Sequence, residues 1–293
     1  MKITVLGTGL MGAPMAQKLA ENGYEVTAYN RTPEKLKPLE DAGINTTTDP
    51  TVALKASECI ILMLSDISAI RGVLLDTETM KQLMVGKTFI QMGTIAPQES
   101  KALGDAMIEA AAQYLEAPVL GSIPQVKSGT LQIMVGSTPE QYDKWVGVLK
   151  NFGENPLHTG AVGTAAAMKL AMNQLIGSLT SAFASSLGMI EREGVDIEQF
   201  MSILRDSALY APTFDKKLER MRDRDFSNPN FPSKHLLKDV NLFIKEAESL
   251  GLDLNLVQGV KAVVEKTLTL GLADQDYSAL FCAVAGTEST GGE

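Results

Sequence analysis

Short apolar runs separated by helical patterns fill the first part of the chain. An apolar run at 3–6 leads into the glycine-containing stretch 7–12, a helical pattern reaches about residue 22, and a second apolar run covers 26–29. Strand, glycine turn, helix and strand within about 30 residues predict a βαβ unit. The alternation continues with a helical pattern at 33–42, a short segment near 44, a helix at 50–55, strands at 59–64 and 88–92, and a helix at 97–113. A strand that begins at 114 then runs into a glycine-serine loop at 121–122, and a β-like run covers 129–135.

Helical patterns replace the strands in the second part of the chain. A well-formed helix is expected from Gly160 to about Glu193, roughly 30 residues or about 45 Å long. Ser233 is a candidate N-cap, and the tail 286–293 is expected to be disordered. Further helices are predicted at 196–204, 213–222, 234–250, 255–270 and 278–285, with Gly251 and Gly271 at helix ends.

These patterns predict an α/β protein with a second, helical part. A Rossmann-like domain is expected at 1–162, an interdomain helix at 163–193 and an all-α domain at 194–293. A length of 293 residues is sufficient for two domains.

Composition narrows the classes of function. A net charge of −9 argues against a nucleic-acid surface, so an anionic substrate would need local cations. Two Cys and two His, without ligand spacing, indicate neither a disulfide scaffold nor a metal cluster, and Cys59 lies in an apolar run typical of a core. The first glycine comes too soon for a signal-peptide core, and no apolar run approaches 18 residues. We therefore expect a cytoplasmic protein without a membrane span.

The stretch Gly7–Gly12 has the spacing of a dinucleotide-binding loop. Gly7 would permit the tight turn, Gly9 the approach of backbone to a pyrophosphate, and Gly12 close packing of helix on strand. The free N–H groups of the following helix would face the phosphates. This motif is weak by itself, but its position between strand and helix favours a dinucleotide site that includes Leu10 and Met11.

The end of the second strand selects between the two nicotinamide dinucleotides. NAD sites usually place Asp or Glu there, whereas this chain has Asn30, Arg31 and Thr32. The planar guanidinium of Arg31 can pair with a 2′-phosphate, and its neighbours can donate without repelling the added charge. These residues favour NADP(H), although Arg31 would also suit an exposed turn before Pro33.

Other strand ends supply further candidates. Ligands of open α/β sheets bind beyond the carboxyl ends of strands, where Leu64, Ser65 and Thr94 are expected. Ordinary turn chemistry explains these residues equally well. The loop Gly121–Ser122 can offer backbone N–H groups to a carboxylate, or it can be a plain hairpin or crossover.

Lys169 and Asn173 are the candidate catalytic pair. Their spacing of four residues stacks both side chains on one helix face. An ordinary lysine at such a position would be a solvated residue of an amphipathic helix. The dinucleotide pattern in the rest of the chain favours the catalytic interpretation.

Several motifs in sequence order carry a family resemblance. The chain resembles the β-hydroxyacid dehydrogenase family, which includes 3-hydroxyisobutyrate and 6-phosphogluconate dehydrogenases, and within it the glyoxylate/succinic semialdehyde reductase branch. The matching stretches are G-L-M-G at 9–12, N-R-T at 30–32, M-L-S-D at 63–66, E-A-P-V at 116–119, G-T-L at 129–131, the G-x-x-G…K-x-x-x-N run at 160–173, F-P-x-K-H-x-x-K-D at 231–239 and G-L-x-D-x-D-Y-S at 271–278.

The resemblance implies hydride transfer from NADPH to a small aldehyde that carries a carboxylate, such as glyoxylate or succinic semialdehyde. It implies that Lys169 is the general acid and that a lysine there separates the chain from related imine reductases. It also implies a homodimer or homotetramer. The remaining implied roles are orientation of Lys169 and substrate by Asn173, closure over the nicotinamide side by Lys238 with Asp239 as a possible partner, a pocket wall from Phe231, and carboxylate binding by Gly121–Ser122.

Two positions depart from the family pattern. Leu120 stands where a substrate-binding serine is usual, and Gly93 replaces the serine usually found before Thr94. Leu120 makes that wall apolar, so we expect a preference for an aldehyde longer or more apolar than glyoxylate, anchored by backbone N–H groups and Ser122.

Three functions remain open from the sequence. The first is the NADPH-dependent aldehyde reductase. The second is a dehydrogenase of the same fold that oxidises 3-hydroxy acids, or a reductase of another carbonyl substrate. The third is a protein that binds NADP(H) without chemistry, which would have no need of both Lys169 and Asn173.

Overall fold

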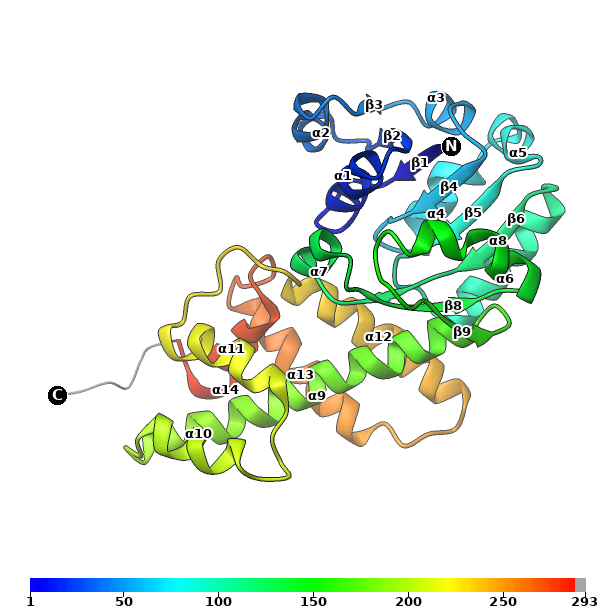
Figure 1. The fold of residues 1–293 in the computed structure, drawn as a ribbon. Helices are drawn as coiled ribbons and strands as arrows, with labels where there is room; N and C mark the ends of the chain where they lie inside the picture. Colours follow the sequence, from blue (N-terminus) through cyan, green and yellow to red (C-terminus); the bar gives the residue numbers. More distant parts are fainter. Residues whose placement is uncertain (288–293) are drawn as a thin grey trace. The chain divides into compact units, whose positions relative to one another are not determined.

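The computed structural model describes residues 1–287 and divides the chain into two compact units, Met1–Lys169 and Leu170–Glu293. Most of the tail expected to be disordered, residues 288–293, lies outside the described part. The unit boundary falls inside the long helix, after Lys169. Each unit is described separately, and Figure 1 gives the order of their elements.

Unit 1 is built on a nine-stranded sheet with the order β3-β2-β1-β4-β5-β6-β8-β7, in which β9 pairs with β8. The first six strands are parallel, β8 runs antiparallel to β6 and β7, and β9 is parallel to β8. This confirms the predicted Rossmann-type α/β fold. The strands are β1 (Lys2–Leu6), β2 (Glu25–Tyr29), β3 (Asn45–Thr47), β4 (Cys59–Leu62), β5 (Thr88–Gln91), β6 (Gln113–Glu116), β7 (Val119–Leu120), β8 (Gln132–Gly136) and β9 (Leu157–Gly160).

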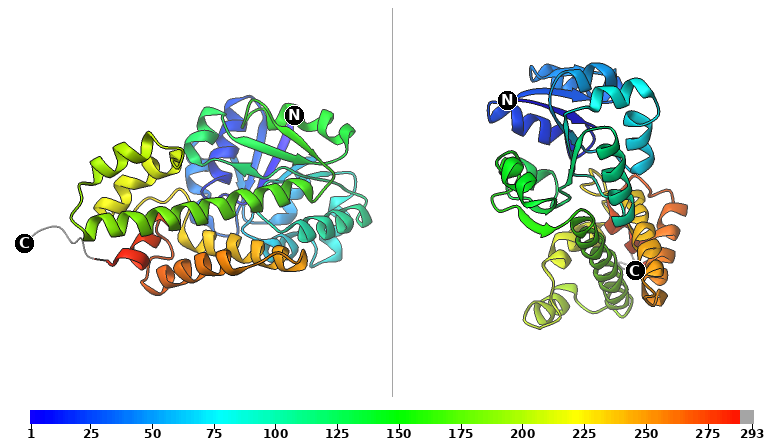
Figure 2. Two further views of the ribbon diagram at one scale, coloured as in Figure 1. Left: turned by 90° about the horizontal axis from the view of Figure 1, so that it is seen from below. Right: turned by 90° about the vertical axis from the view of Figure 1, so that its right-hand side faces the viewer.

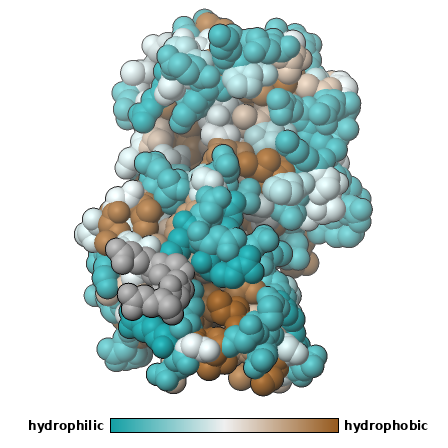
Figure 3. All heavy atoms as spheres, turned by 90° about the vertical axis from the view of Figure 1, so that its left-hand side faces the viewer, coloured by the Kyte–Doolittle hydropathy of each residue, from teal (hydrophilic) through white to brown (hydrophobic). Residues whose placement is uncertain are grey.

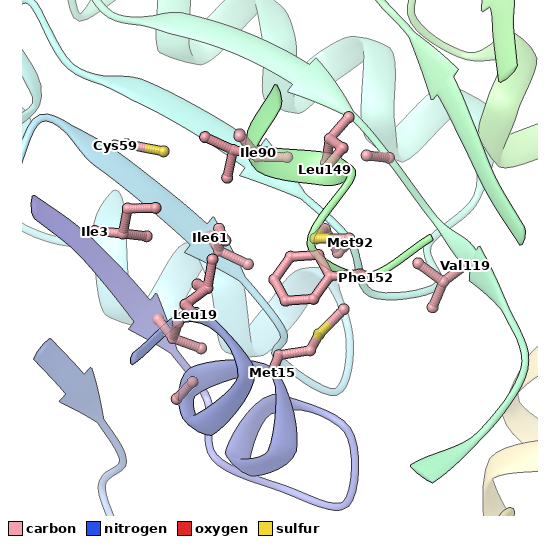
Figure 4. Packing of buried hydrophobic residues seen from close by; sticks show 14 of the residues in the cluster. Ile3, Met15, Leu19, Cys59, Ile61, Ile90, Met92, Val119, Leu149 and Phe152 are labelled. Carbon is pink, nitrogen blue, oxygen red and sulfur yellow. The ribbon is translucent and has the colours of Figure 1, made fainter. Parts of the chain in front are cut away.

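The alternation of side chains along each strand sends apolar residues to both faces of this sheet. On β4, Cys59 and Ile61 enter one core, shown in Figure 4, and Ile60 and Leu62 enter the other. The expectation that Cys59 is a core residue is confirmed, and burial raises the pKa of its thiol to about 12. Both cysteines are buried free thiols.

Helices cover both faces of the sheet, and several of them were not predicted. The helix expected at 97–113 ends at Glu109. Gln113 already belongs to strand β6, and its main-chain N–H donates to the Lys87 oxygen. Four helices and strand β9 were not predicted: α4 (Ile67–Leu74), α5 (Glu78–Met84), α7 (Ile123–Ser128) and α8 (Pro139–Leu149). The others are α1 (Gly12–Glu21), the 3₁₀ turn Pro33–Lys35, α2 (Lys37–Asp41), α3 (Pro50–Lys55) and α6 (Pro97–Glu109).

The long helix α9 (Thr164–Arg192) confirms the central helix of the prediction, and Figure 2 shows it nearly straight. The described part of unit 2 after α9 is helical, as expected. Its elements are α10 (Ile197–Arg205), α11 (Pro212–Asp223), α12 (Ser233–Ser249), α13 (Asn255–Thr269), the 3₁₀ turn Tyr277–Ala279 and α14 (Leu280–Ala285).

The prediction that Ser233 is the N-cap of a helix is wrong. Pro232 holds that position, and Ser233 is the first residue of α12. The Ser233 hydroxyl donates to the main-chain oxygens of Gln275 and Asp276, 3.2 and 3.4 Å away. A tertiary contact with a distant loop therefore competes with the local cap.

Most of the surface drawn in Figure 3 is hydrophilic, and apolar residues show in smaller areas. Among residues 1–287, no helix combines the length and the apolar character that a membrane span needs.

Candidate functional site

The glycine loop after β1 has the shape that a dinucleotide pyrophosphate needs. Gly7 has φ +101°, and a Cβ there would lie 2.4 Å from the Met63 carbonyl oxygen. A Cβ on Gly12 would lie 1.8 Å from the Gly7 oxygen, whereas a Cβ on Gly9 would meet no atom within 4 Å. Gly7 and Gly12 thus pack backbone on backbone, and Gly9 leaves open space beside the start of α1. Leu10 in the same loop is exposed, and Met11 packs partly against the core.

The three residues after β2 have different environments. The Asn30 amide donates to Thr8 Oγ1 at 3.0 Å and accepts from the Thr32 N–H at 3.0 Å, so its side chain ties the strand end to the glycine loop. Arg31 is exposed beside it. The guanidinium is therefore the group at this strand end that remains accessible to an anionic ligand.

The ends of β4 and β5 lie side by side, since these strands are paired. Ser65 donates to Asp66 at 2.8 Å, and Asp66 accepts the Ala69 N–H at the start of α4. Leu64 and Thr94 are half-buried. A Cβ on Gly93 would lie 2.8 Å from the Leu64 carbonyl oxygen, which explains why a glycine occupies this position.

The loop after β7 is held by Gln125, which was not predicted as a site residue. Gln125 Oε1 accepts from both the N–H and the hydroxyl of Ser122, at 2.9 and 2.8 Å. Gly121 has φ +134°, a conformation that favours glycine, and Leu120 is half-buried. Both Ser122 donors are engaged, so carboxylate binding by them would require displacement of Gln125. The Ser-x-x-Gln spacing of a capping box was the signal for this contact.

Lys169 lies in the second turn of α9 and is only 8% exposed. It is therefore not the solvated lysine that an amphipathic helix would ordinarily carry. The helix start is held by Glu116, a second residue without a predicted role. Its carboxylate accepts the main-chain N–H groups of Gly163, Ala165 and Ala166 at 2.8, 2.9 and 3.1 Å.

In unit 2, Asn173 contacts another predicted site residue. Asn173 is 3% exposed, and its Nδ2 donates to Asp239 Oδ2 at 2.6 Å. Lys238 Nζ forms an ion pair with Asp239 Oδ1 at 3.1 Å. Asn173 Oδ1 is buried and has no hydrogen-bond partner among the described residues. Because buried acceptors are normally paired, this oxygen is available to a hydroxyl group of a ligand.

Phe231 belongs to an aromatic group at the start of α12. Its ring stacks with His235, with centroids 6.5 Å apart, and meets Tyr277 edge-on at 5.7 Å. Burial lowers the pKa of His235, and the nearby cations Lys238 and Lys234 act in the same direction. His235 is therefore held neutral beside Phe231.

The predicted site residues are distributed over both units. Unit 1 carries the open glycine loop and the buried Lys169, and unit 2 carries Asn173, whose Oδ1 is a buried acceptor without a partner among the described residues. Within residues 1–287, no three His, Cys, Asp or Glu side chains are grouped as metal ligands.

Comparisons with known proteins identify the family of the chain. Residues 2–163 match the family model described as the NAD binding domain of 6-phosphogluconate dehydrogenase, and residues 163–284 match the NAD-binding model of NADP-dependent 3-hydroxyisobutyrate dehydrogenase. Glyoxylate/succinic semialdehyde reductase 1 of Arabidopsis thaliana is 30% identical over 97% of this chain and 98% of its own.

Two further proteins extend the comparison. Glyoxylate/succinic semialdehyde reductase 2 of Arabidopsis thaliana, a chloroplastic protein, is 29% identical over 98% of this chain and 80% of its own. The crystal structure of a 3-hydroxyisobutyrate dehydrogenase from Salmonella typhimurium shares the fold, with a TM-score of 0.86 at 19% identity over 96% of this chain and 99% of that one. The chain therefore belongs to the β-hydroxyacid dehydrogenase family and is an oxidoreductase that uses a nicotinamide dinucleotide.

Proposed function

We propose that the protein reduces a small carboxylate-bearing aldehyde, succinic semialdehyde or glyoxylate, to the hydroxy acid with NADPH. The observation that carries this proposal is the buried amine of Lys169, one helical turn before the buried amide of Asn173. The names of the Arabidopsis thaliana relatives support the substrate class.

The residues of unit 1 fit a bound NADPH. Gly7, Gly9 and Gly12 would hold the pyrophosphate, and Arg31 would pair with the 2′-phosphate. Leu64, Ser65 and Thr94 would contact the cofactor beyond the strand ends. Bound NADPH would supply the hydride. The family model for residues 163–284, which names an NADP-dependent enzyme, supports NADP(H) over NAD(H).

Lys169 would give a proton to the carbonyl oxygen of the substrate as the alkoxide develops. Its charge would also stabilise that oxygen before the proton moves. Asn173 would orient Lys169 and hydrogen-bond the substrate: the Nδ2 hydrogen that does not bind Asp239 would donate to the carbonyl oxygen, and Oδ1 would accept from the hydroxyl group of the product. Lys238 would close over the nicotinamide side, and Phe231 would form an apolar wall.

An aldehyde panel tests the proposed function directly. We expect NADPH absorbance to fall in the presence of succinic semialdehyde or glyoxylate and to stay constant with an aldehyde that lacks a carboxylate. Constant absorbance with every member of the panel would remove the reductase function and leave the 3-hydroxy acid dehydrogenase or a protein that only binds the dinucleotide.

Leu120 leads us to propose a preference for succinic semialdehyde over glyoxylate. Its side chain offers no hydrogen bond, and the neighbouring Ser122 already donates to Gln125. We expect Leu120→Ser to shift the ratio of kcat/KM values toward glyoxylate. An unchanged ratio would contradict this assignment.

A 3-hydroxy acid dehydrogenase is the second candidate function, because the matching family model carries that description. Reduction of NADP⁺ by 3-hydroxyisobutyrate, faster than any aldehyde is reduced, would favour it.

We also propose a cytoplasmic location for the enzyme.

A further inference from the structure

Glu116 is a buried carboxylate that connects three elements of unit 1. It ends β6, where it pairs in register with Gln91 of β5 and Gly136 of β8. Its side chain is directed to the start of α9, where one oxygen accepts three main-chain N–H groups. The first N–H groups of a helix have no partner within the helix, and its positive dipole end favours an anion.

The second oxygen of this carboxylate is bound from the opposite side. Ser100 of α6 donates to Glu116 Oε2, and the Ser100 hydroxyl also lies 2.8 Å from the Tyr114 hydroxyl. Glu116 is 1% exposed. Burial raises its pKa, whereas the Ser100 hydroxyl and the α9 N–H groups favour its charged form. Both oxygens are thus fixed by hydrogen bonds to two different helices.

Two glycines provide the space for this arrangement. A Cβ on Gly136 would lie 2.4 Å from Glu116 Oε1, and a Cβ on Gly104 would lie 3.1 Å from the Tyr114 ring. The buried carboxylate therefore has a cavity shaped for it by the neighbouring strand and helix. An exposed Ser or Asp would be sufficient for an ordinary helix cap, without the cost of burying a charge.

Glu116 is close in the chain or through its hydrogen bonds to two parts of the proposed site, Lys169 and the loop Gly121–Ser122. Lys169 follows Ala165 by four residues, so it lies one turn beyond the N–H group that Glu116 binds. In the other direction, β6 continues through Ala117 and Pro118 into β7 and the loop Gly121–Ser122. A rotation of the first turn of α9 would move Lys169 relative to this loop.

We propose that Glu116 is a positioning residue, whose carboxylate fixes the first turn of α9 and thereby the place of the Lys169 amine. The effect on turnover rests on the proposed function. Small displacements of a catalytic group can cost about 10²-fold in rate. We therefore expect Glu116→Gln to lower kcat by about 10- to 100-fold, with the Kd for NADPH changed less than about threefold.

Glu109→Gln is the matched control, because Glu109 is an exposed glutamate on α6. It should leave kcat, KM and the Kd for NADPH unchanged. The second variant, Gly136→Ala, keeps the charge but displaces it, because the added Cβ would overlap Glu116 Oε1. It should also lower kcat at unchanged NADPH affinity, so the proposal can be tested even where Glu116→Gln does not fold.

A readout without turnover separates this proposal from the proposed function. The lysine side chains are labelled with ¹³C at Cε during expression, and the Lys169 resonance is identified by its loss in Lys169→Arg. We expect this resonance to shift in Glu116→Gln and Gly136→Ala but not in Glu109→Gln. If the native protein reduces no aldehyde, the proposed function fails. The positioning role of Glu116 is then judged from the Lys169 resonance alone. An unchanged resonance, or kcat within twofold of native in a folded variant of an active enzyme, overturns the positioning role.

Discussion

Lys169 and Glu116 are both ionisable side chains that the fold has almost removed from water. Lys169 was found from the sequence because it belongs to a spaced motif with Asn173. Glu116 was not, because no local pattern indicates that a glutamate at a strand end caps a helix nearly 50 residues later in the chain. For single residues, a spaced motif therefore indicates candidate chemistry, whereas contacts between residues far apart in the chain leave no local pattern.

Lys169→Ala tests the general acid. We expect kcat to fall by about 10²- to 10⁴-fold, the range for loss of an acid–base group, because no other amine takes this place on α9. Steady-state kinetics give kcat, and a fluorescence titration should show unchanged NADPH binding. Lys150→Ala, at an exposed lysine of unit 1, is the control. A loss smaller than tenfold would assign proton donation to another group.

Arg31→Ala tests the choice of dinucleotide. Loss of a charge-assisted pair with the 2′-phosphate should weaken NADPH binding by about 10-fold or more, since such bonds contribute about 1.5–3 kcal/mol. NADH has no 2′-phosphate, so its Kd should stay within about twofold. Fluorescence titration with both dinucleotides measures the two values, with the exposed Lys37→Ala as control. Equal losses for both would refute the assignment.

At the scale of elements, the start of α12 is held by a segment that comes after the next helix, α13, in the chain. At the start of α12, the Ser233 N–H donates to the Gln275 oxygen at 2.9 Å, in the loop before the 3₁₀ turn. The N–H of Tyr277, the first residue of that turn, donates to the oxygen of Phe231, just before α12, at 3.0 Å. The loop is anchored by a buried ion pair, Lys217 Nζ to Asp276 Oδ1 at 2.7 Å. Burial lowers the pKa of Lys217, so the pair is held at a desolvation cost.

Lys217→Met tests this anchor. Removal of one partner leaves Asp276 buried without a counter-charge, so we expect the free energy of unfolding to fall by about 3–5 kcal/mol. Urea unfolding followed by circular dichroism measures the change. Lys216→Met, at the exposed neighbour, should change it by less than about 0.5 kcal/mol. A similar small effect of Lys217→Met would show that the ion pair does not stabilise unit 2.

The lowered pKa of His235, on the same helix, leads us to expect that stability depends on pH. Its pKa in the folded protein lies below the ordinary value of 6.5, so the unfolded chain takes up the proton first as pH falls. The stabilising contribution is full above pH 6.5 and is lost as pH falls through the folded pKa. The Tm of the native protein should therefore decrease more between pH 7 and pH 5 than the Tm of His235→Phe. Parallel decreases would contradict this origin.

At the scale of the whole molecule, the order of elements could be predicted and several of their limits could not. The pattern around 3–29 identified the βαβ unit, because strand, glycine loop and helix were each well formed. Two of the four missed helices, Glu78–Met84 and Ile123–Ser128, are shorter than two full turns, whereas α4 and α8 are longer and length does not explain why they were missed. Likewise, the pairing of β8 between β6 and β7 depends on long-range contacts that periodicity along the chain does not contain.

The predicted homodimer or homotetramer is a property of the whole molecule. Leu175, Leu179 and Met189 are exposed on α9 and follow a heptad spacing with the exposed Ala182 and Ser186. We expect light scattering after size exclusion to give two or four times the chain mass. Leu179→Glu should shift the protein toward a monomer, and Ile203→Glu, at an exposed residue of α10, should not. A monomeric native protein would contradict the prediction.

Gly93 has a consequence for engineering. Exchange of specificity between relatives is often attempted one side chain at a time, and the serine usual in the family before Thr94 would be a natural choice. Here its Cβ would come within 2.8 Å of a main-chain oxygen at Leu64. The donor hydroxyl could be introduced only if the adjoining segment moved with it, so residues around 63–65 and 93 would have to be transplanted as one block.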